Sequence, residues 1–165
     1  GADLPHVFTS WDIFGFGGRA EINGDCFIFD DTGTFEAISV ADALVDAGAK
    51  VTMVSRYDSM GAKIAFPAAT VEASKERLMS GNFDFIGGHY VQGITPDEVL
   101  IGVPFTERRR AIPAGTVVLV TYNHPNREIA EYAPAGTNVH LIGDVTGTNS
   151  IMAAIHQAAA TARAI

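Results

Sequence analysis

The chain has little cysteine and no long apolar run, and each shortage excludes a class of protein. The single cysteine, Cys26, excludes an internal disulfide, and also an iron–sulfur cluster or a cysteine-rich zinc site made by this chain alone. Because Cys26 begins the apolar run 26–29, we expect a buried, unreactive thiol. No stretch approaches the ~20 apolar residues of a membrane-spanning helix, so no membrane partner is expected.

Positive charge is also scarce. Lys and Arg number 11 against 19 Asp and Glu, and the formal net charge is -8 at pH 7. Because nucleic acids and anionic membranes are bound by clustered Lys and Arg, we expect neither as a partner. The one basic run, residues 108–110, follows Glu107 and is predicted to be a solvated loop. No signal peptide is expected, so the predicted compartment is the cytoplasm.

Motifs for hydrolysis, metal binding and phosphate binding are missing as well. The five histidines are scattered without the spacing of metal ligands, and the sequence has neither a G-x-S-x-G elbow nor a P-loop. We therefore predict no catalytic residue and no metal site.

What the sequence does contain is a βαβ pattern. The apolar run 26–29 predicts a buried strand, and residues 34–47 predict a helix with Ile38, Ala41 and Leu44 on one face. Gly48 ends this helix, and residues 50–54 predict a second strand, parallel to the first.

The rest of the chain predicts further elements of an α/β fold. Residues 83–86, 89–91 and 99–103 predict short strands in an antiparallel meander or crossover at one sheet edge. Other expected elements are strands at 116–121 and 138–142 and helices at 10–13, 71–79, 126–132 and 149–165. The expected fold is a three-layer Rossmann-like domain of the NAD(P)-binding type, with a mainly parallel sheet and an antiparallel edge.

The turn after the first strand of the βαβ unit is the first candidate site. It reads Asp31, Thr32, Gly33 and Thr34. A dinucleotide fingerprint needs glycines here for a tight turn, for the approach of the pyrophosphate and for helix packing, and a helix N-terminus then faces the phosphates.

Only Gly33 stands in the G-x-G-x-x-G frame of this turn. Asp30, Asp31 and Glu36 place negative charge near the position of a diphosphate. The turn therefore either holds a cofactor or only keeps the shape of a βα turn, and both interpretations stay open.

The end of the second strand is the next candidate. Ser55 and Arg56 follow Gly33 at the spacing of about 20 residues at which dinucleotide-binding domains contact the adenosine ribose. An Arg there suits a 2′-phosphate, which favours NADP over NAD if a dinucleotide binds. The alternative is an Arg that only ends a strand. Later in the chain, Gly143 and Asp144 precede the last helix; Asp144 is either an N-cap residue or a ligand for a cofactor hydroxyl.

These motifs resemble a known family. Residues 29–37 (Phe-Asp-Asp-Thr-Gly-Thr-Phe-Glu-Ala), 41–44 and 48–56 are similar to the pyridine-nucleotide half of the two-dinucleotide-domain region in the 2,4-dienoyl-CoA reductase and trimethylamine dehydrogenase family of NADH:flavin oxidoreductases, which are related to old yellow enzyme. Residues 140–144 and 150–156 resemble the closing segment of that region. The resemblance extends from about residue 6 to 165 and is least specific over 60–115.

The resemblance implies an architecture. Family members begin with an FMN-binding barrel and cluster-binding cysteines, followed by an FAD- or ADP-binding region into which an NAD(P)-binding domain is inserted. This chain has neither the barrel nor the first glycine-rich part of the FAD-type domain. The implied organisation is a leading segment at 1–24, an NAD(P)-binding-like domain at 25–137, and the closing strand and helix of the FAD- or ADP-type domain at 138–165.

The resemblance also implies roles. Gly33 matches the fingerprint turn, Ser55 and Arg56 match the adenosine side, and Asp144 matches the position that hydrogen-bonds the flavin ribityl chain. NAD(P) is the implied cofactor of the inserted domain, and FAD or ADP needs the missing part. FMN and the iron–sulfur cluster belong to the parent enzyme.

The predicted function is therefore a pyridine-dinucleotide-binding module of a flavin-dependent oxidoreductase, inactive alone. It would support electron transfer between NAD(P)H and flavin. Its partner is the remainder of the parent flavoenzyme, in one chain or as a separate subunit. The missing glycines at Asp31 and Glu36 favour an alternative, since some relatives keep this domain as a non-binding scaffold. A second departure is His156 and Gln157, where the family carries a Gly-Arg pair.

Overall fold

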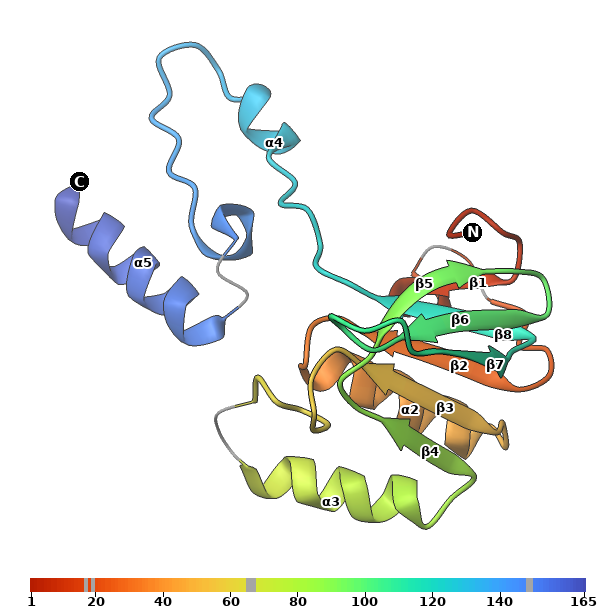
Figure 1. Ribbon diagram of the computed structural model, residues 1–165. Helices are drawn as coiled ribbons and strands as arrows, with labels where there is room; N and C mark the ends of the chain where they lie inside the picture. The colour runs from red at the N-terminus through yellow and green to blue at the C-terminus, as the bar shows by residue number, and fades with distance from the viewer. Residues whose placement is uncertain (17, 19, 65–67, 148–149) are drawn as a thin grey trace. The chain divides into compact units, whose positions relative to one another are not determined.

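The computed structural model describes residues 1–16, 18, 20–64, 68–147 and 150–165. It contains two compact units, residues 1–122 and residues 123–165 (Figure 1). The elements of the first unit are, in chain order, β1 (Val7–Thr9), α1 (Ser10–Ile13), β2 (Cys26–Asp30), α2 (Phe35–Asp46), β3 (Val51–Ser55), α3 (Ala68–Met79), β4 (Phe83–Ile86), β5 (Tyr90–Ile94), β6 (Glu98–Gly102), β7 (Arg109–Pro113) and β8 (Thr116–Val120).

A five-stranded parallel sheet forms the centre of the first unit. Its strand order is β1-β8-β2-β3-β4. The predicted βαβ unit is confirmed, since β2 and β3 pair in parallel from Cys26 opposite Val51 to Asp30 opposite Ser55. Asp30 and Ser55 therefore lie side by side where these two strands end.

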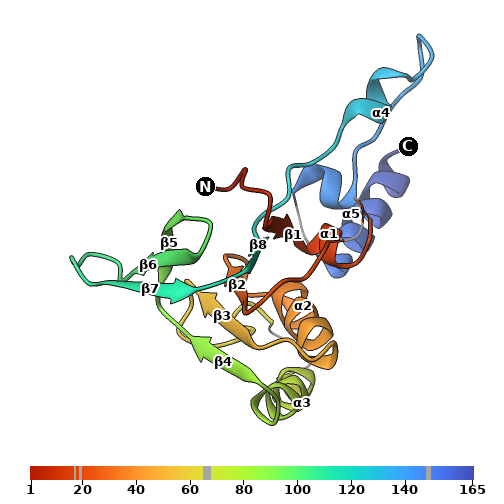
Figure 2. The same ribbon diagram turned by 90° about the vertical axis from the view of Figure 1, so that its right-hand side faces the viewer.

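The antiparallel strands form a sheet of their own, in the order β5-β6-β7. Figure 2 shows this sheet on one face of the parallel sheet and α2 and α3 on the other. The α/β fold with a mainly parallel sheet is thus confirmed. The antiparallel strands, expected at an edge of that sheet, cover its face instead.

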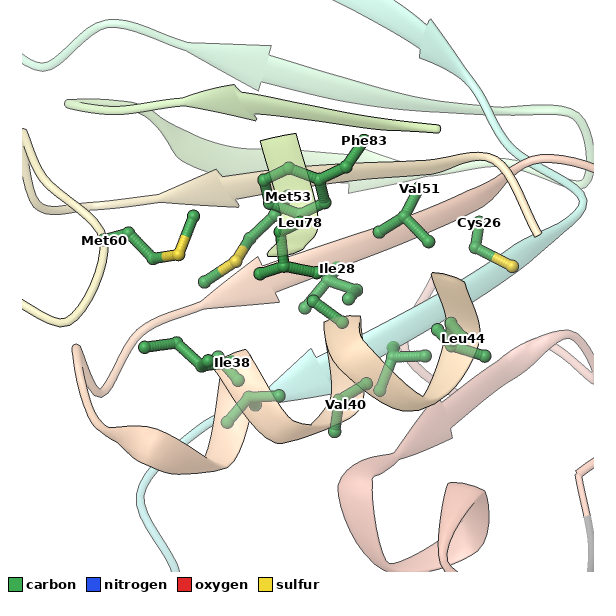
Figure 3. Packing of buried hydrophobic residues seen from close by; sticks show 14 of the residues in the cluster. Cys26, Ile28, Ile38, Val40, Leu44, Val51, Met53, Met60, Leu78 and Phe83 are labelled. Carbon is green, nitrogen blue, oxygen red and sulfur yellow. The ribbon is translucent and has the colours of Figure 1, made fainter. Parts of the chain in front are cut away.

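The two faces of the parallel sheet are buried in two separate cores. On the helix side, Ile28 and Met53 from the sheet meet Val40 and Leu44 from α2 and Leu78 from α3 (Figure 3). On the other side, a second core joins the two sheets; its buried members are Phe27, Val54, Val99, Ile101, Ile112, Ala114 and Val117. Each fully buried aliphatic side chain contributes roughly 1.5–3 kcal/mol.

Two strands differ from the sequence expectation. Arg109 and Arg110, expected in a solvated loop, begin β7, because this segment pairs along its length with β6. β1 was not expected either, and it pairs with β8. In α1 the N-cap is Thr9, and Asp12 Oδ2 accepts hydrogen bonds from the Thr9 backbone N–H and hydroxyl, each at 2.8 Å.

The second unit has little regular structure. It contains α4 (Glu128–Glu131), the 3-10 helix η1 (Gly143–Thr146) and α5 (Ile151–Ala164). The strand expected at 138–142 is not formed, and this corrects the sequence prediction. Among the described residues no strand lies beside it to accept its backbone hydrogen bonds, and a strand needs such a neighbour. The domain boundary after residue 137 stays a prediction.

Of the helices that the structure describes, none combines the length and the apolar character required to cross a membrane.

Candidate functional site

The candidate site lies where β2 and β3 end. The predicted turn residues Asp31, Thr32, Gly33 and Thr34 connect β2 to α2, and Ser55 and Arg56 close β3 beside them. The Arg56 backbone N–H donates to the Asp30 carbonyl oxygen at 3.3 Å, which ties the two strand ends together. The structure therefore brings these six predicted residues to one edge of the sheet.

The carboxylate of Asp30 fills the inside of this turn. It has no exposed surface. Its Oδ1 accepts hydrogen bonds from the Gly33 N–H at 2.7 Å, the Thr32 N–H at 3.1 Å and the Thr32 hydroxyl at 3.2 Å. Its Oδ2 accepts one from the Ser55 hydroxyl at 3.1 Å. Two backbone N–H groups of the turn are thus already bound to a carboxylate of the same chain.

This arrangement was not found by sequence reasoning. Asp30 was counted only as a negative charge near a diphosphate, whereas it is a buried acceptor. The signal in the sequence is an Asp at the last position of a buried strand with Gly33 three residues later, because short Asp side chains hydrogen-bond backbone N–H groups in such turns.

The side chain of Tyr57 covers the backbone of Gly33. Its φ is +67°, and a Cβ placed there would lie 2.9 Å from two ring carbons of Tyr57. Its carbonyl oxygen accepts the Lys63 backbone N–H at 2.9 Å. Because the Tyr57 ring rests against the Gly33 backbone, it occupies the space through which a pyrophosphate approaches this glycine in a dinucleotide-binding turn.

Tyr57 is held by several neighbours. Its hydroxyl lies 3.5 Å from that of Tyr122, and this hydrogen bond raises the pKa of Tyr57 above its usual value. The guanidinium carbon of Arg56 and the Nζ of Lys63 lie 5.7 and 5.6 Å from the centre of the ring, within the range of cation–π attraction.

Arg56 itself has a carboxylate partner. Its Nη1 lies 3.1 Å from Asp31 Oδ1, with 52 % and 28 % of the two side chains exposed. A 2′-phosphate bound by Arg56 would have to compete with Asp31. Arg56, the predicted adenosine-side residue, therefore lies directly after β3 and is already paired.

The N-terminus of α2 is less occupied. Its N-cap Thr34 makes no side-chain capping bond in the structure, and its hydroxyl lies 2.9 Å from that of Thr32. Glu36 in the first turn accepts a hydrogen bond from the Ser10 hydroxyl. The unpaired N–H groups of a first turn attract anions, whereas Glu36 adds a negative charge of its own.

Gly143 and Asp144 belong to the second unit. Gly143 is buried with φ +75°, and its N–H donates to Gln157 Oε1 at 2.8 Å. Thr146 donates to the Gly143 carbonyl oxygen at 2.7 Å and lies 3.2 Å from the Gln157 side chain. Asp144 is exposed. Gln157, seen in the sequence only as a departure from a Gly-Arg pair, thus holds this turn against α5.

Comparison with known proteins gives structures but no sequence family. No protein-family model and no curated protein matches the chain. Among solved structures, 6-hydroxypseudooxynicotine amine oxidase from Pseudomonas geniculata N1 is 28 % identical with a TM-score of 0.81, covering 95 % of this chain and 24 % of the other. Histamine dehydrogenase from Rhizobium sp. 4-9 is 23 % identical with a TM-score of 0.76, covering 95 % and 26 %.

Other similar structures extend the same fold. 2-Naphthoyl-CoA reductase is 22 % identical with a TM-score of 0.75, covering 95 % of this chain and 23 % of that one. The flavoprotein disulfide reductase of Escherichia coli is 15 % identical with a TM-score of 0.62, covering 94 % and 38 %. The chain thus spans about a quarter of the length of the first structures, and it has an α/β fold that recurs within oxidoreductases.

Proposed function

We propose that this chain is a dinucleotide-domain module of a flavin-dependent oxidoreductase, and that its pyridine-nucleotide turn is closed, so that the module acts as a scaffold within the enzyme. The observation that carries the proposal is the buried Asp30 carboxylate, which binds the Gly33 and Thr32 N–H groups. The likeness to an amine oxidase, at 28 % identity over 95 % of this chain, supports the class of parent enzyme.

The physical argument is one of competition. A pyrophosphate needs the same backbone N–H groups that Asp30 occupies, and it would have to approach across the Tyr57 ring. Displacing Asp30 would leave a carboxylate without its acceptor bonds, next to a doubly charged ligand, in surroundings that screen charge poorly. The closed turn is therefore favoured over the liganded one.

In this proposal the remainder of the parent enzyme performs the reaction. That remainder, joined in one chain or present as a separate subunit, holds the FMN, the iron–sulfur cluster and most of the FAD or ADP site. Its substrate is an amine or an unsaturated acyl compound, as the resemblance and the names of the similar structures imply.

The second candidate is NAD(P) binding by this module, for electron transfer between NAD(P)H and flavin. The observation that favours it is the position of Arg56, half exposed at the end of β3, together with the uncapped first turn of α2. In that case Arg56 would exchange Asp31 for a 2′-phosphate, and NADPH would bind more tightly than NADH.

Calorimetric titration of the folded chain with NADPH, NADH and ADP, at one moderate salt concentration, separates the two candidates. The closed turn predicts no heat from any of the three, with folding verified by circular dichroism. Binding of NADPH in preference to NADH, with the preference lost in Arg56→Ala and kept in the control Arg163→Ala, would overturn the scaffold proposal.

A further inference from the structure

We propose that a basic pocket at the start of β7 binds an organic phosphate. The pocket has a volume of about 280 Å³ and is lined by His89, Ile101, Val103 and the three arginines 108–110. None of its residues belongs to the turn at Gly33, so this site is independent of the closed turn.

The strand pairing explains why arginines line this pocket. In the β6–β7 ladder, Ile112 lies opposite Val99 and Arg110 lies opposite Ile101. Because side chains alternate along a strand, Arg110 stands on the same face as Ile112, which is buried between the two sheets. Arg108, just before β7, lines the same pocket. The face of the antiparallel sheet that packs on the core thus changes from apolar to basic at its end.

The pocket lies at the carboxyl edge of the parallel sheet. The His89 backbone N–H donates to the carbonyl oxygen of Ser55, the last residue of β3, at 3.0 Å. In Figure 1, β7 begins at the end of the sheet towards which β2 and β3 point. Open α/β sheets bind their ligands in the crevice outside the carboxyl ends of the strands, so the arginines stand where a ligand of this fold is expected.

Among the described residues, few carboxylates pair with the three arginines to balance their positive charge. Arg109 has one carboxylate nearby, Glu107 Oε2 at 3.7 Å, and both side chains are exposed. Within the part of the chain that the structure describes, neither Arg108 nor Arg110 forms an ion pair. The chain as a whole carries a net charge of -8, yet three consecutive arginines line this pocket with Glu107 as their one ion-pair partner among the described residues. An external anion would balance the remaining positive charge.

The lining indicates the class of anion. Guanidinium groups form paired hydrogen bonds with phosphate and carboxylate oxygens. A phosphomonoester carries close to two negative charges and three acceptor oxygens, which matches several arginines better than a single carboxylate does. Val103, which is partly exposed, adds an apolar surface that inorganic phosphate would leave uncovered. The ligand class is therefore a phosphate ester with a small apolar group.

Titration of the 15N-labelled chain with phenyl phosphate, followed by NMR, tests this site. We expect shifts at the amides of His89, Val103 and Arg110, and binding at least about tenfold tighter than that of benzoate, since more charge meets the arginines. Arg110→Gln should weaken binding about tenfold, and the Arg108→Gln/Arg110→Gln double variant should abolish it.

Two control variants test whether the loss of binding is specific to arginines of this pocket. Arg163→Gln removes the same charge from α5, and Arg56→Gln removes it from the end of β3; both should leave phenyl phosphate binding unchanged. The proposal is overturned if no amide near the pocket shifts, if Arg163→Gln weakens binding as much as Arg110→Gln, or if benzoate binds as tightly. Loss in Arg56→Gln alone would instead place the anion at the Gly33 turn, against both this site and the closed turn.

Discussion

At the scale of single residues, the end of β2 depends on one carboxylate. Asp30 accepts hydrogen bonds from Thr32, Gly33 and Ser55 while it has no exposed surface. Sequence reasoning predicted the turn and the glycine, since both follow from local turn chemistry. It missed the direction of the Asp30 side chain, because it counted the carboxylate as a charge near a diphosphate and did not use the preference of a short Asp side chain for backbone N–H groups of a following turn.

Asp30→Ala should destabilise the fold by about 2–3 kcal/mol, because the buried N–H groups of Thr32 and Gly33 lose their acceptor, whereas the Ser55 hydroxyl keeps the backbone carbonyl oxygen of residue 30. Urea unfolding measures the change. Asp31→Ala is the matched control: its carboxylate is partly exposed and forms one surface ion pair with Arg56, worth about 0–1 kcal/mol. Equal losses in the two variants would contradict the role given to Asp30.

Cys26 should resist thiol reagents in the folded chain. It is 1 % exposed, and burial raises the pKa of its thiol. Ellman's reagent should react with it only after unfolding in urea. Because the folded pKa lies above the unfolded one, Cys26 contributes stability that is fully present below about pH 8.5 and is lost as the pH rises through the folded pKa.

Comparison of the wild type with Cys26→Ala checks this pH dependence. The difference in unfolding free energy between the two chains should shrink from pH 7 to pH 10. A difference that is constant with pH, or fast labelling of the folded chain, would show that the thiol is not buried as described.

At the scale of elements, some helices and strands can be predicted from neighbouring residues, whereas others form only through pairing with residues far along the chain. The helix at Phe35–Asp46 and the strands beside it follow from periodicity in neighbouring residues, and the structure contains them. β1 has three residues, and only its pairing with β8, far along the chain, makes it a strand. Residues 138–142 illustrate the reverse case, since their strand-like sequence has no described neighbour and forms no strand.

The contact between the β2–α2 turn and the segment after β3 can be measured with Gly33→Ala. Alanine there meets both an unfavourable φ of +67° and the Tyr57 ring. Gly48→Ala is a control for the backbone alone, because Gly48 has φ +86° and nothing within 4 Å of its Cβ position. We expect Gly48→Ala to cost about 1–2 kcal/mol and Gly33→Ala to cost more.

Tyr57→Ala completes a double-mutant cycle. If the ring rests on Gly33, the cost of Gly33→Ala should fall towards that of Gly48→Ala once Tyr57 is removed, by roughly 0.5–3 kcal/mol of coupling. Additive costs would mean that the Tyr57 ring does not lie against this turn. The ring would then not block the approach of a pyrophosphate to Gly33.

The turn at Gly143 depends on α5 through Gln157. Gln157→Ala should speed hydrogen exchange of the Gly143 amide, because its acceptor is removed. Gln157→Glu keeps an acceptor oxygen at the same reach and should preserve the protection. Exchange at Ala153, whose N–H is bound by the N-cap Ser150, serves as the internal reference. Unchanged exchange in Gln157→Ala would contradict this role.

At the scale of the whole molecule, the two units differ in how much apolar surface they bury. Every residue of the two cores lies within residues 1–122. In the second unit, α5 has no buried residue, and Ile151, Met152 and Ile155 are 78 %, 78 % and 64 % exposed. The stability of the chain therefore resides in the first unit.

A chain ending at Tyr122 should accordingly still fold and show a cooperative urea transition, because it contains every residue of the two cores. It should also bind less of a hydrophobic dye, since the exposed side chains of α5 are absent. Loss of the cooperative transition would show that the two cores do not suffice for the fold.

The place of β8 in the sheet has a consequence for biosynthesis. β8 lies between β1 and β2, although the ribosome makes it after all the other strands. While the chain emerges, β2, β3 and β4 can associate with α2 and α3, but β1 has no neighbour until Thr116–Val120 has left the exit tunnel. Within this sheet, the strand that is synthesised before the others is thus the last to find its partner, and a chaperone would meet Val7–Thr9 as an unpaired segment of the sheet while residues 10–115 are made.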